Sequence, residues 1–380
     1  MHMLDYETLR LIWWLIMGVL LIGFAITDGF DMGVGAIFRF VGRTDEERRV
    51  LLESIEPVWE GNQVWFILGG GAAFAAWPLL YAASFSALYL AMFLVLLALI
   101  LRPVGFAFRS KLSAPAWRNL WDWALCAGGA LPAVLFGVAF GNLFLGVPFH
   151  FDELHRPVCT AGFFNLLHPF ALLCGVVSVA MLIMHGATYA AGKVDTTIVP
   201  RAGAAGRWAA LIFIVAFIAA GFWVAAGLDG QKIVSNIDTS ADSNPLNKSV
   251  VLARGLWLGN FRAQPLLWLA PASAVVAALL TYWLLRAGRS GFAFATSALA
   301  QAGTILTAGI ALFPFLMPSS THPDHGLTIW DASSSARTLS IMLVVVLVFL
   351  PIVLAYTAWT FRVLRGRITL EQVRRHLGFY

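Results

Sequence analysis

Residues 11–38 read LIWWLIMGVLLIGFAITDGFDMGVGAIF, an apolar run whose only ionisable residues are Asp28 and Asp31. A helix needs about 20 predominantly apolar residues to cross the hydrocarbon core of a bilayer, and this run is longer. No basic stretch precedes it and no small-residue cleavage pattern ends it, so it lacks the form of a signal peptide. We therefore expect a membrane-spanning helix that the protein retains.

The composition extends this expectation to the whole chain. Of the 380 residues, 60% are hydrophobic and only 12% are charged, and the mean hydropathy is 0.80. A water-soluble domain needs far more polar surface, so a soluble globular class is excluded. The formal net charge of +5 would suit a nucleic-acid partner, but basic residues in a membrane protein usually mark its cytoplasmic loops.

Eight further apolar runs follow the first, and together they predict the fold class. We expect an all-α integral membrane protein of about nine transmembrane helices, arranged as two four-helix groups plus one additional helix. Only Trp77, Pro78 and Tyr81 separate the second run from the third, and Pro78 predicts a break or kink. The nine runs are residues 11–38, 63–82, 84–101, 121–145, 164–190, 207–228, 264–286, 291–316 and 339–361.

These runs leave room for a single polytopic membrane domain over residues 1–380 and for no large soluble domain. We expect a first helical group, a second helical group, a last helix and a short basic tail. Their approximate limits are residues 8–145, 164–316, 339–361 and 362–380.

The distribution of Lys and Arg predicts the orientation in the membrane. If the amino terminus lies outside, the inside segments hold 18 of the 25 basic residues. Such an excess is typical of cytoplasmic segments, so we expect the amino terminus outside and the carboxyl terminus in the cytoplasm. The inside segments would be residues 39–62, 102–120, 191–207, 286–290 and 362–380.

Several ionisable residues lie within or at the ends of the apolar runs. Asp28 and Asp31 are three residues apart, so they share one face of the first helix. Glu60 opens the second span, Arg102 closes the third, and Asp122 opens the fourth. Under the expected topology, all five residues lie toward the cytoplasmic half of one four-helix group.

A charge near the bilayer centre costs about 2.5 to 3.5 kcal/mol, so these residues need partners or a function. One interpretation is a proton inlet, because carboxyl groups in a dry interior exchange protons along bridging water. The other is an ion-pair network in which Arg102 neutralises one acid and fixes the helix register. The residues themselves leave both interpretations open.

The histidines and cysteines do not form a recognisable haem or metal motif. His168 and His185 fall near opposite ends of the fifth span, roughly 26 Å apart along a straight helix, too far to bind one iron from both sides. The other six histidines lie in expected loops or tails, and the three cysteines lack CxxC spacing. We expect neither a metal site nor a haem site in this chain.

Eight ordered segments resemble subunit II of the cytochrome bd-type quinol oxidases. The resemblance extends through essentially the whole chain, which makes it more specific than any single motif. The matching segments are residues 5–10, 27–33, 59–65, 102–106, 137–142, 243–247, 313–320 and 327–335.

The resemblance implies a haem-bearing subunit I as partner, with two haems b, one haem d and the quinol-oxidising loop. Subunit II of that family binds no haem, although some members hold a structural quinone, to which we assign no residues here. The complex oxidises quinol, reduces oxygen to water and generates a proton motive force in the bacterial cytoplasmic (inner) membrane. A small single-helix accessory subunit is a further expected partner.

The resemblance also implies a cytoplasmic proton path, which in this family includes an acid at the position of Glu60. Asp31, Asp28 and Arg102 are its expected neighbours, and Asp122 is expected to be a structural interior charge. Some members carry a further acid at position 107 and a histidine at position 58. This chain has Ala107 and Val58 there, so water or an acid of subunit I would have to compensate.

A proton-coupled secondary transporter is the alternative from another functional class. Transporters often contain two repeated halves whose broken helices meet at the membrane midplane. Here the ionisable residues gather in the first four runs, and the later runs contain no matching acidic pair. This asymmetry favours the oxidase subunit.

Overall fold

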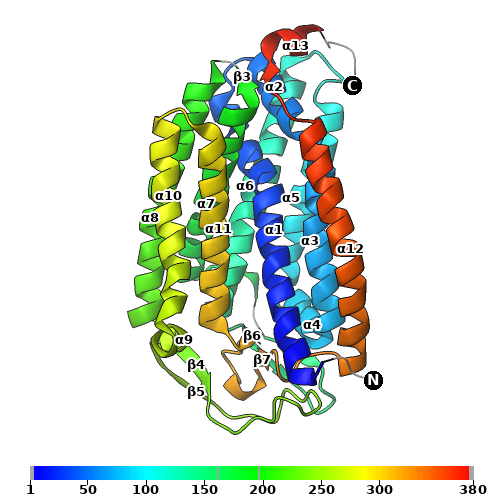
Figure 1. Ribbon diagram of the computed structural model, residues 1–380, viewed down its shortest axis with the longest axis vertical. Coiled ribbons are helices and arrows are strands. Elements are labelled where there is room, and N and C mark those ends of the chain that lie inside the picture. The colour runs from blue at the N-terminus through cyan, green and yellow to red at the C-terminus, as the bar shows by residue number, and fades with distance from the viewer. Residues whose placement is uncertain (1–3, 161, 196, 376–380) are drawn as a thin grey trace.

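The apolar runs form long helices that lie along one common axis (Figure 1). The structure is a computed structural model that describes residues 4–160, 162–195 and 197–375. Within these residues, eight helices are long and apolar enough to cross a membrane, and a bent helix pair raises the number to nine. The expected class of about nine spans is confirmed. The eight helices are α1 (Tyr6–Val41), α5 (Tyr89–Phe108), α6 (Pro115–Leu145), α7 (Pro169–Lys193), α8 (Ile198–Ala226), α10 (Leu269–Arg286), α11 (Ser290–Leu312) and α12 (Ala336–Val363).

The bent pair consists of α3 (Trp59–Ala76) and α4 (Pro78–Ala87), which meet at an angle of 119°. Proline disfavours helical geometry in the residue before it, and Trp77 has φ −137° and ψ 73°. The break expected at Pro78 is therefore present. The second span therefore ends at Ala76 instead of residue 82, because the chain turns away at this break.

Short elements cover the two ends of the bundle. We call the end with α2, β3, β8 and α13 the basic end, and the end with the β4–β5 hairpin the loop end; they lie at the top and bottom of Figure 1. The elements of the basic end are α2 (Asp45–Ile55), β3 (Val194–Asp195), β8 (Ile368–Thr369) and α13 (Leu370–Arg375). Those of the loop end are β1 (Phe149–Phe151), β2 (Pro157–Cys159), β4 (Asp229–Ile233), β5 (Val250–Arg254), α9 (Gly259–Ala263), β6 (Phe315–Met317) and β7 (Leu327–Thr328).

Three of the differences between the helices and the predicted runs have local reasons. The fifth span begins at Pro169 instead of residue 164, and the Nδ1 atom of His168 caps it by accepting the N–H of Phe170. The eighth span ends at Leu312 instead of residue 316, because Pro314 cannot continue a helix. The third is α2, which lies in a segment expected to be a loop.

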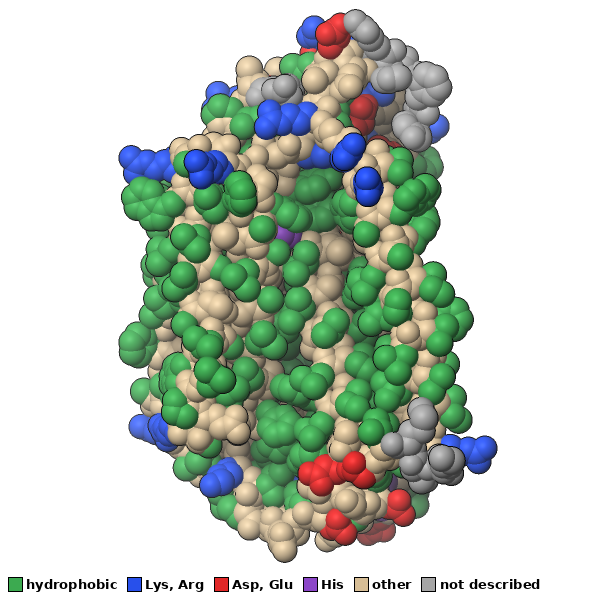
Figure 2. All heavy atoms as spheres, in the orientation of Figure 1, with side chains coloured by type: hydrophobic (Ala, Val, Ile, Leu, Met, Phe, Trp, Pro, Cys, Tyr) green, Lys and Arg blue, Asp and Glu red, His purple; other side chains and the backbone are tan. Residues whose placement is uncertain are grey.

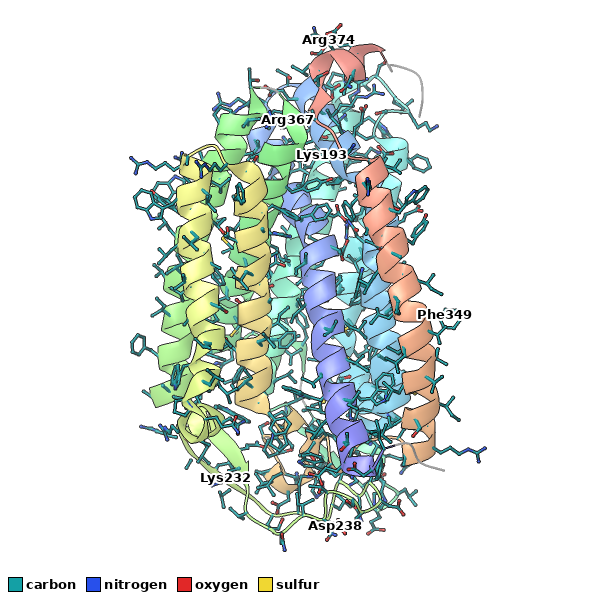
Figure 3. The ribbon with its side chains drawn as sticks, in the orientation of Figure 1. Lys193, Lys232, Asp238, Phe349, Arg367 and Arg374 are labelled. Carbon is teal, nitrogen blue, oxygen red and sulfur yellow. The ribbon has the colours of Figure 1, made fainter. Side chains whose placement is uncertain are left out.

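Polar side chains gather at the two ends, and hydrophobic ones form a band between them (Figure 2). Lys193, Arg367 and Arg374 lie at the basic end, and Lys232 and Asp238 lie at the loop end (Figure 3). Arg374 forms an ion pair with Glu46 of α2 at 2.7 Å, which fastens the carboxyl-terminal segment over the basic end. The proposed division into two helical groups, a last helix and a tail stays a prediction.

Helix α1 approaches its neighbours closely because glycines line its contacts with α6 and α7. A Cβ atom added at Gly33 would overlap the carbonyl group of Leu182, and one at Gly186 would overlap the backbone of α1. A Cβ atom at Gly129 of α6 would lie 2.5 Å from the carbonyl oxygen of Met32. Small residues permit such contact between backbones, which is a main source of helix association in membranes.

The loop end is fastened to α1 by a buried arginine. Arg10 is fully buried and donates hydrogen bonds to the carbonyl oxygens of Thr239 and Ala241, at 2.6 and 3.0 Å, and to Ser243 Oγ at 3.0 Å. Its guanidinium also lies over the ring of Tyr6, 3.6 Å from the ring centroid. These contacts join α1 to the long segment between β4 and β5.

We expect Gly33→Ala to destabilise the protein by about 1–3 kcal/mol, because the added methyl forces α1 away from α7. Gly18→Ala is the matched control, since it changes the same helix at a site where an added Cβ meets nothing within 4 Å. Thermal unfolding of the detergent-purified protein measures the difference. Equal stability of the two variants would show that the α1–α7 contact is not close.

Candidate functional site

A buried ion pair joins α1 to α5. Arg102 donates from Nη1 to Asp28 Oδ2 at 3.1 Å and from Nη2 to Asp28 Oδ1 at 2.7 Å. The side chains of Arg102 and Asp28 are 3% and 0% exposed. Two parallel charge-assisted hydrogen bonds are the strongest form of such a pair and fix its orientation. The pairing that the ion-pair interpretation required is therefore present.

Asp31 lies one turn further along α1 and has a different environment. Its Oδ2 atom accepts a hydrogen bond from Asn62 Nδ2 at 2.8 Å and lies 4.0 Å from Arg102 Nη2. Its Oδ1 atom is buried and has no hydrogen-bond partner among the described residues. Two carboxyl groups thus share one guanidinium, and the cluster is neutral only when one of them carries a proton.

A small cavity lies against this cluster. Its volume is about 10 Å³, and Asp31 and Arg102 belong to its lining. A volume of about 10–15 Å³ accommodates the centre of one water molecule, and a carboxyl oxygen without a partner is the kind of group that such water binds. The remaining lining residues are Gly35, Leu52, Ile55, Phe106, Leu125 and Gly129.

A second, much larger cleft of about 490 Å³ lies at the basic end. Glu60 lines it, together with the acids Glu53 and Glu56 and the bases Arg49, Arg109 and Lys111. The cleft and the small cavity share two lining residues, Leu52 and Phe106. Leu52 and Phe106 therefore border both the polar cleft and the cavity beside Asp31.

Leu52 lies on a helix that was not expected from the sequence. Residues 39–62 were expected to be a loop, whereas α2 occupies Asp45–Ile55 and buries Leu51, Leu52 and Ile55. A capping box begins the helix, since Thr44 Oγ1 accepts the N–H of Glu47 and Glu47 accepts the N–H of Thr44. A threonine followed three residues later by a glutamate and then by an apolar run is a recognisable helix start.

Glu47 also ties α2 to α8. Its Oε1 atom accepts hydrogen bonds from Thr197 Oγ1 at 2.7 Å and from Arg201 Nη2. Burial raises the pKa of the Glu47 carboxyl, but hydrogen bonds from Arg201, Thr197 and the backbone outweigh this effect and lower the pKa to about 2. The helix that carries Leu52 is therefore held in place by an ionised carboxylate.

Asp122 lies in a separate cluster nearer the basic end. Its carboxylate is fully buried and accepts hydrogen bonds from Arg109 at 2.5 Å and Arg48 at 2.7 Å, while Arg39 lies 3.8 Å away. Arg48 and Arg39 come from α2 and α1, and Arg109 directly follows α5, so the cluster joins these three elements to α6. These contacts support a structural role for the charge of Asp122. That role stays a prediction.

His168 and His185, the two histidines near the ends of the fifth span, form hydrogen bonds within the protein. His185 donates from Nε2 to the carbonyl oxygen of Ile26 at 2.9 Å, and its Nδ1 lies 2.7 Å from Ser297 Oγ. His168 uses Nδ1 as a helix cap. Among the described residues, no group of three or more His, Cys, Asp or Glu side chains could hold a metal ion. His2 and His376 lie outside the described residues.

The sequence comparisons point to one family. A family model described as cytochrome bd terminal oxidase subunit II matches residues 9–364. The chain is 54% identical to cytochrome bd-I ubiquinol oxidase subunit 2 of Escherichia coli K12, over 98% of this chain and 99% of the relative. It is 51% identical to a probable cytochrome oxidase subunit 2 of Haemophilus influenzae, over 96% and 97% of the two chains.

The structural comparison agrees with the sequence comparisons at the level of the fold. A solved chain from the bd oxidase of Geobacillus thermodenitrificans matches with a TM-score of 0.71. The match covers 94% of this chain and 98% of the other, at 17% sequence identity. The all-α membrane architecture is therefore shared.

We expect Arg102→Gln to lower the free energy of unfolding by about 3–5 kcal/mol, because Asp28 loses its partner in a buried site. Arg118→Gln is the control, since Arg118 is paired with Asp45 at a partly exposed site and contributes about 1 kcal/mol or less. Chemical unfolding of the purified protein measures both variants. The double variant with Asp28→Asn and Arg102→Gln should recover part of the lost free energy of unfolding. Similar losses for Arg102→Gln and Arg118→Gln would contradict a buried ion pair.

We also expect the stability difference between wild type and Glu47→Gln to depend on pH. The folded-state pKa is about 2 and the ordinary value is 4.5, so the ionised group stabilises the fold fully above pH 4.5. Its contribution is lost as the pH falls from 4.5 toward 2. Thermal midpoints measured across this range should converge for the two proteins, whereas the control Glu153→Gln, at the loop end, should follow wild type throughout. If the thermal midpoints of Glu47→Gln and wild type kept a constant difference across this pH range, the contact of ionised Glu47 with Thr197 and Arg201 would be contradicted.

Proposed function

The chain belongs to the cytochrome bd terminal oxidase subunit II family, and we propose that within this oxidase it delivers protons from the basic end of the bundle to Asp31. As a member of that family it is a subunit of a quinol oxidase, an oxidoreductase complex that contains haem, and a subunit I is its partner. This assignment replaces the transporter alternative. In agreement with it, the spans from α7 to α12 contain no Asp or Glu.

The proposed reaction of the complex is the oxidation of quinol coupled to the reduction of oxygen to water. The name of the Escherichia coli relative, a ubiquinol oxidase subunit, supports quinol as the electron donor. The family resemblance implies two haems b and one haem d, and we assign them to subunit I. In support of this assignment, His168 and His185 use ring nitrogens for hydrogen bonds within this chain. The accessory subunit and the structural quinone stay predictions.

Oxygen reduction to water consumes one proton for every electron, so the complex needs a steady proton supply. The observation that carries our proposal is the water-sized cavity beside Asp31, which shares the lining residues Leu52 and Phe106 with the polar cleft. Small movements of these two side chains would connect the cleft to the cavity. One bridging water would then place a proton on the unpartnered Oδ1 atom of Asp31.

Asp31 is the proposed carrier, and Asp28 is its fixed neighbour. Both oxygens of Asp28 accept hydrogen bonds from Arg102, which fixes this carboxyl group in place. The Oδ2 atom of Asp31 lies 4.0 Å from Nη2 of the same arginine. Asp31 is therefore the carboxyl group of the pair that we propose to take up and release the proton. Asn62 orients the carboxyl group through its hydrogen bond to Oδ2.

Glu60 is the proposed outer acid of the path. It lies in the first turn of α3, is exposed in this chain, and lines the cleft. Ala107 lines the same cleft, so the space that an acid occupies in some family members is open to water here. Val58 is buried beside this region and offers no proton-carrying group. Water in the cleft would therefore compensate for both differences.

The basic end is the proposed cytoplasmic end. It contains 18 of the 25 Lys and Arg residues, which favours the inner side of a bacterial cytoplasmic membrane. The amino terminus would then lie outside and the carboxyl terminus inside. Taking chemical protons from this side would contribute to a proton motive force.

We expect Asp31→Asn to lower quinol-driven oxygen consumption on the order of tenfold while haem content stays normal, because a positioned proton carrier is lost. Glu60→Gln should slow turnover less, since water and Glu56 remain in the cleft. Glu46→Gln is the matched control, an acid of the same end that pairs with Arg374 and does not line the cleft. Oxygen uptake and the haem spectrum of the complex, purified through this chain, measure the effect.

Normal turnover of Asp31→Asn at normal haem content would contradict the proposed path. If this variant fails to assemble, Leu52→Phe provides an independent test, because it enlarges a side chain that borders both the cleft and the cavity without removing a charge. We expect Leu52→Phe to slow turnover and to raise the solvent deuterium isotope effect. An unchanged rate and isotope effect in an assembled complex would also contradict the path.

A further inference from the structure

Most arginines of the first four spans at the basic end have acidic partners. Arg39, Arg48 and Arg109 surround Asp122, and Arg102 pairs with Asp28. The corner formed by α8, α10 and α11 is different. In the described part of the chain, Arg207, Arg286 and Arg289 form no ion pair and no side-chain hydrogen bond.

Backbone contacts bring these three arginines to one level of the bundle. Gly206 of α8 packs against α10, where an added Cβ would lie 2.7 Å from Leu285 Cδ1. Arg207 and Arg286 are the next residues of the two helices. Gly288, at φ +71°, then reverses the chain so that α11 begins directly after Arg289. Three positive charges and the positive end of α11 therefore lie at one corner. The carboxyl end of α10 gives Arg286 a partial negative charge, but no acidic side chain among the described residues pairs with these arginines.

The surface below this corner is apolar and aromatic. Trp208, Trp283 and Phe292 are 68%, 58% and 69% exposed, and the guanidinium of Arg286 lies over Trp283 at 5.4 Å from the ring centroid. Figure 2 shows Lys and Arg side chains at the upper ends of α8 and α10, directly above hydrophobic side chains. Exposed tryptophans favour the headgroup level of a bilayer, so the arginines lie where lipid phosphates lie.

We propose that Arg207, Arg286 and Arg289 bind the headgroup of an anionic phospholipid whose acyl chains lie along α8 and α10. Basic sites between transmembrane helices are suited to such lipids, because their phosphate supplies the missing counter-charge at the correct depth. A planar guanidinium binds phosphate oxygens in a bidentate manner. The exposed Ile212 and Val215 of α8 and Leu279 and Leu280 of α10 offer an apolar surface to the acyl chains.

Native mass spectrometry of the detergent-purified complex, titrated with dioleoyl phosphatidylglycerol, tests this site. We expect wild type to retain one phosphatidylglycerol that dioleoyl phosphatidylcholine does not replace. Arg286→Gln should weaken this binding about fivefold, and the triple Gln variant should abolish it, since each arginine near the surface contributes to attraction of anionic lipid. Arg43→Gln is the charge-matched control, because Arg43 is exposed at the same end but outside this corner.

Three results would overturn the proposal. The first is wild-type affinity for phosphatidylglycerol in the triple variant, and the second is equal binding of phosphatidylcholine by wild type. The third is displacement of the lipid by free glycerol phosphate at comparable concentration, which would identify a site for a soluble phosphate. A thermal scan of the triple variant without added lipid should match that of Arg43→Gln, which separates lost binding from misfolding.

Discussion

The Arg102–Asp28 ion pair is the interaction on which the organisation of the first four spans depends. Either charge alone would cost several kcal/mol inside a bilayer, so each helix can carry its charge only when the other helix is in place. The two parallel hydrogen bonds fix the rotation and height of α5 relative to α1. Asp31, one turn away, lies 4.0 Å from the same guanidinium, and its second oxygen has no hydrogen-bond partner among the described residues. The same residue lines a cavity of the size of one water molecule.

Helix α1 can hold this pair because its other faces are packed without bulky side chains. Gly33 and Gly129 permit backbone contact with α7 and α6, and Gly29 lies against the fully buried Gln301 of α11. The result is a central helix with a charged face toward α3 and α5 and a closely packed face toward the other spans. Large side chains at the glycine positions would separate the helices and expose the charged groups to lipid.

The sequence predicted the features that depend on composition and on strong local signals. Apolar run length predicted the spans, and Pro78 predicted the break that ends one of them. The acids and the arginine of the first four spans were predicted to converge, and Asp28, Asp31 and Arg102 do so. The family and the oxidase function were predicted from ordered segments and are confirmed by the comparisons.

Features that depend on packing between distant segments were not predictable in the same way. The pairing of Asp28 rather than Asp31 with Arg102 depends on helix rotation, and the role of Leu52 depends on where α2 lies. Glu60 was expected among the buried acids, yet it lines an open cleft and does not contact them. Helix α2 was missed because its apolar face is too short for a hydropathy argument, although its capping box was readable.

The anchoring of Arg10 has a consequence for how the protein is made. Its three hydrogen-bond acceptors lie 229 to 233 residues later in the chain, so they do not exist when the ribosome has released only the first helix. Synthesis proceeds from the amino terminus, so these contacts of α1 form only after the segment between β4 and β5 has been synthesised. Formation of the Arg10 hydrogen bonds therefore joins the early and the late part of the new polypeptide into one folding unit.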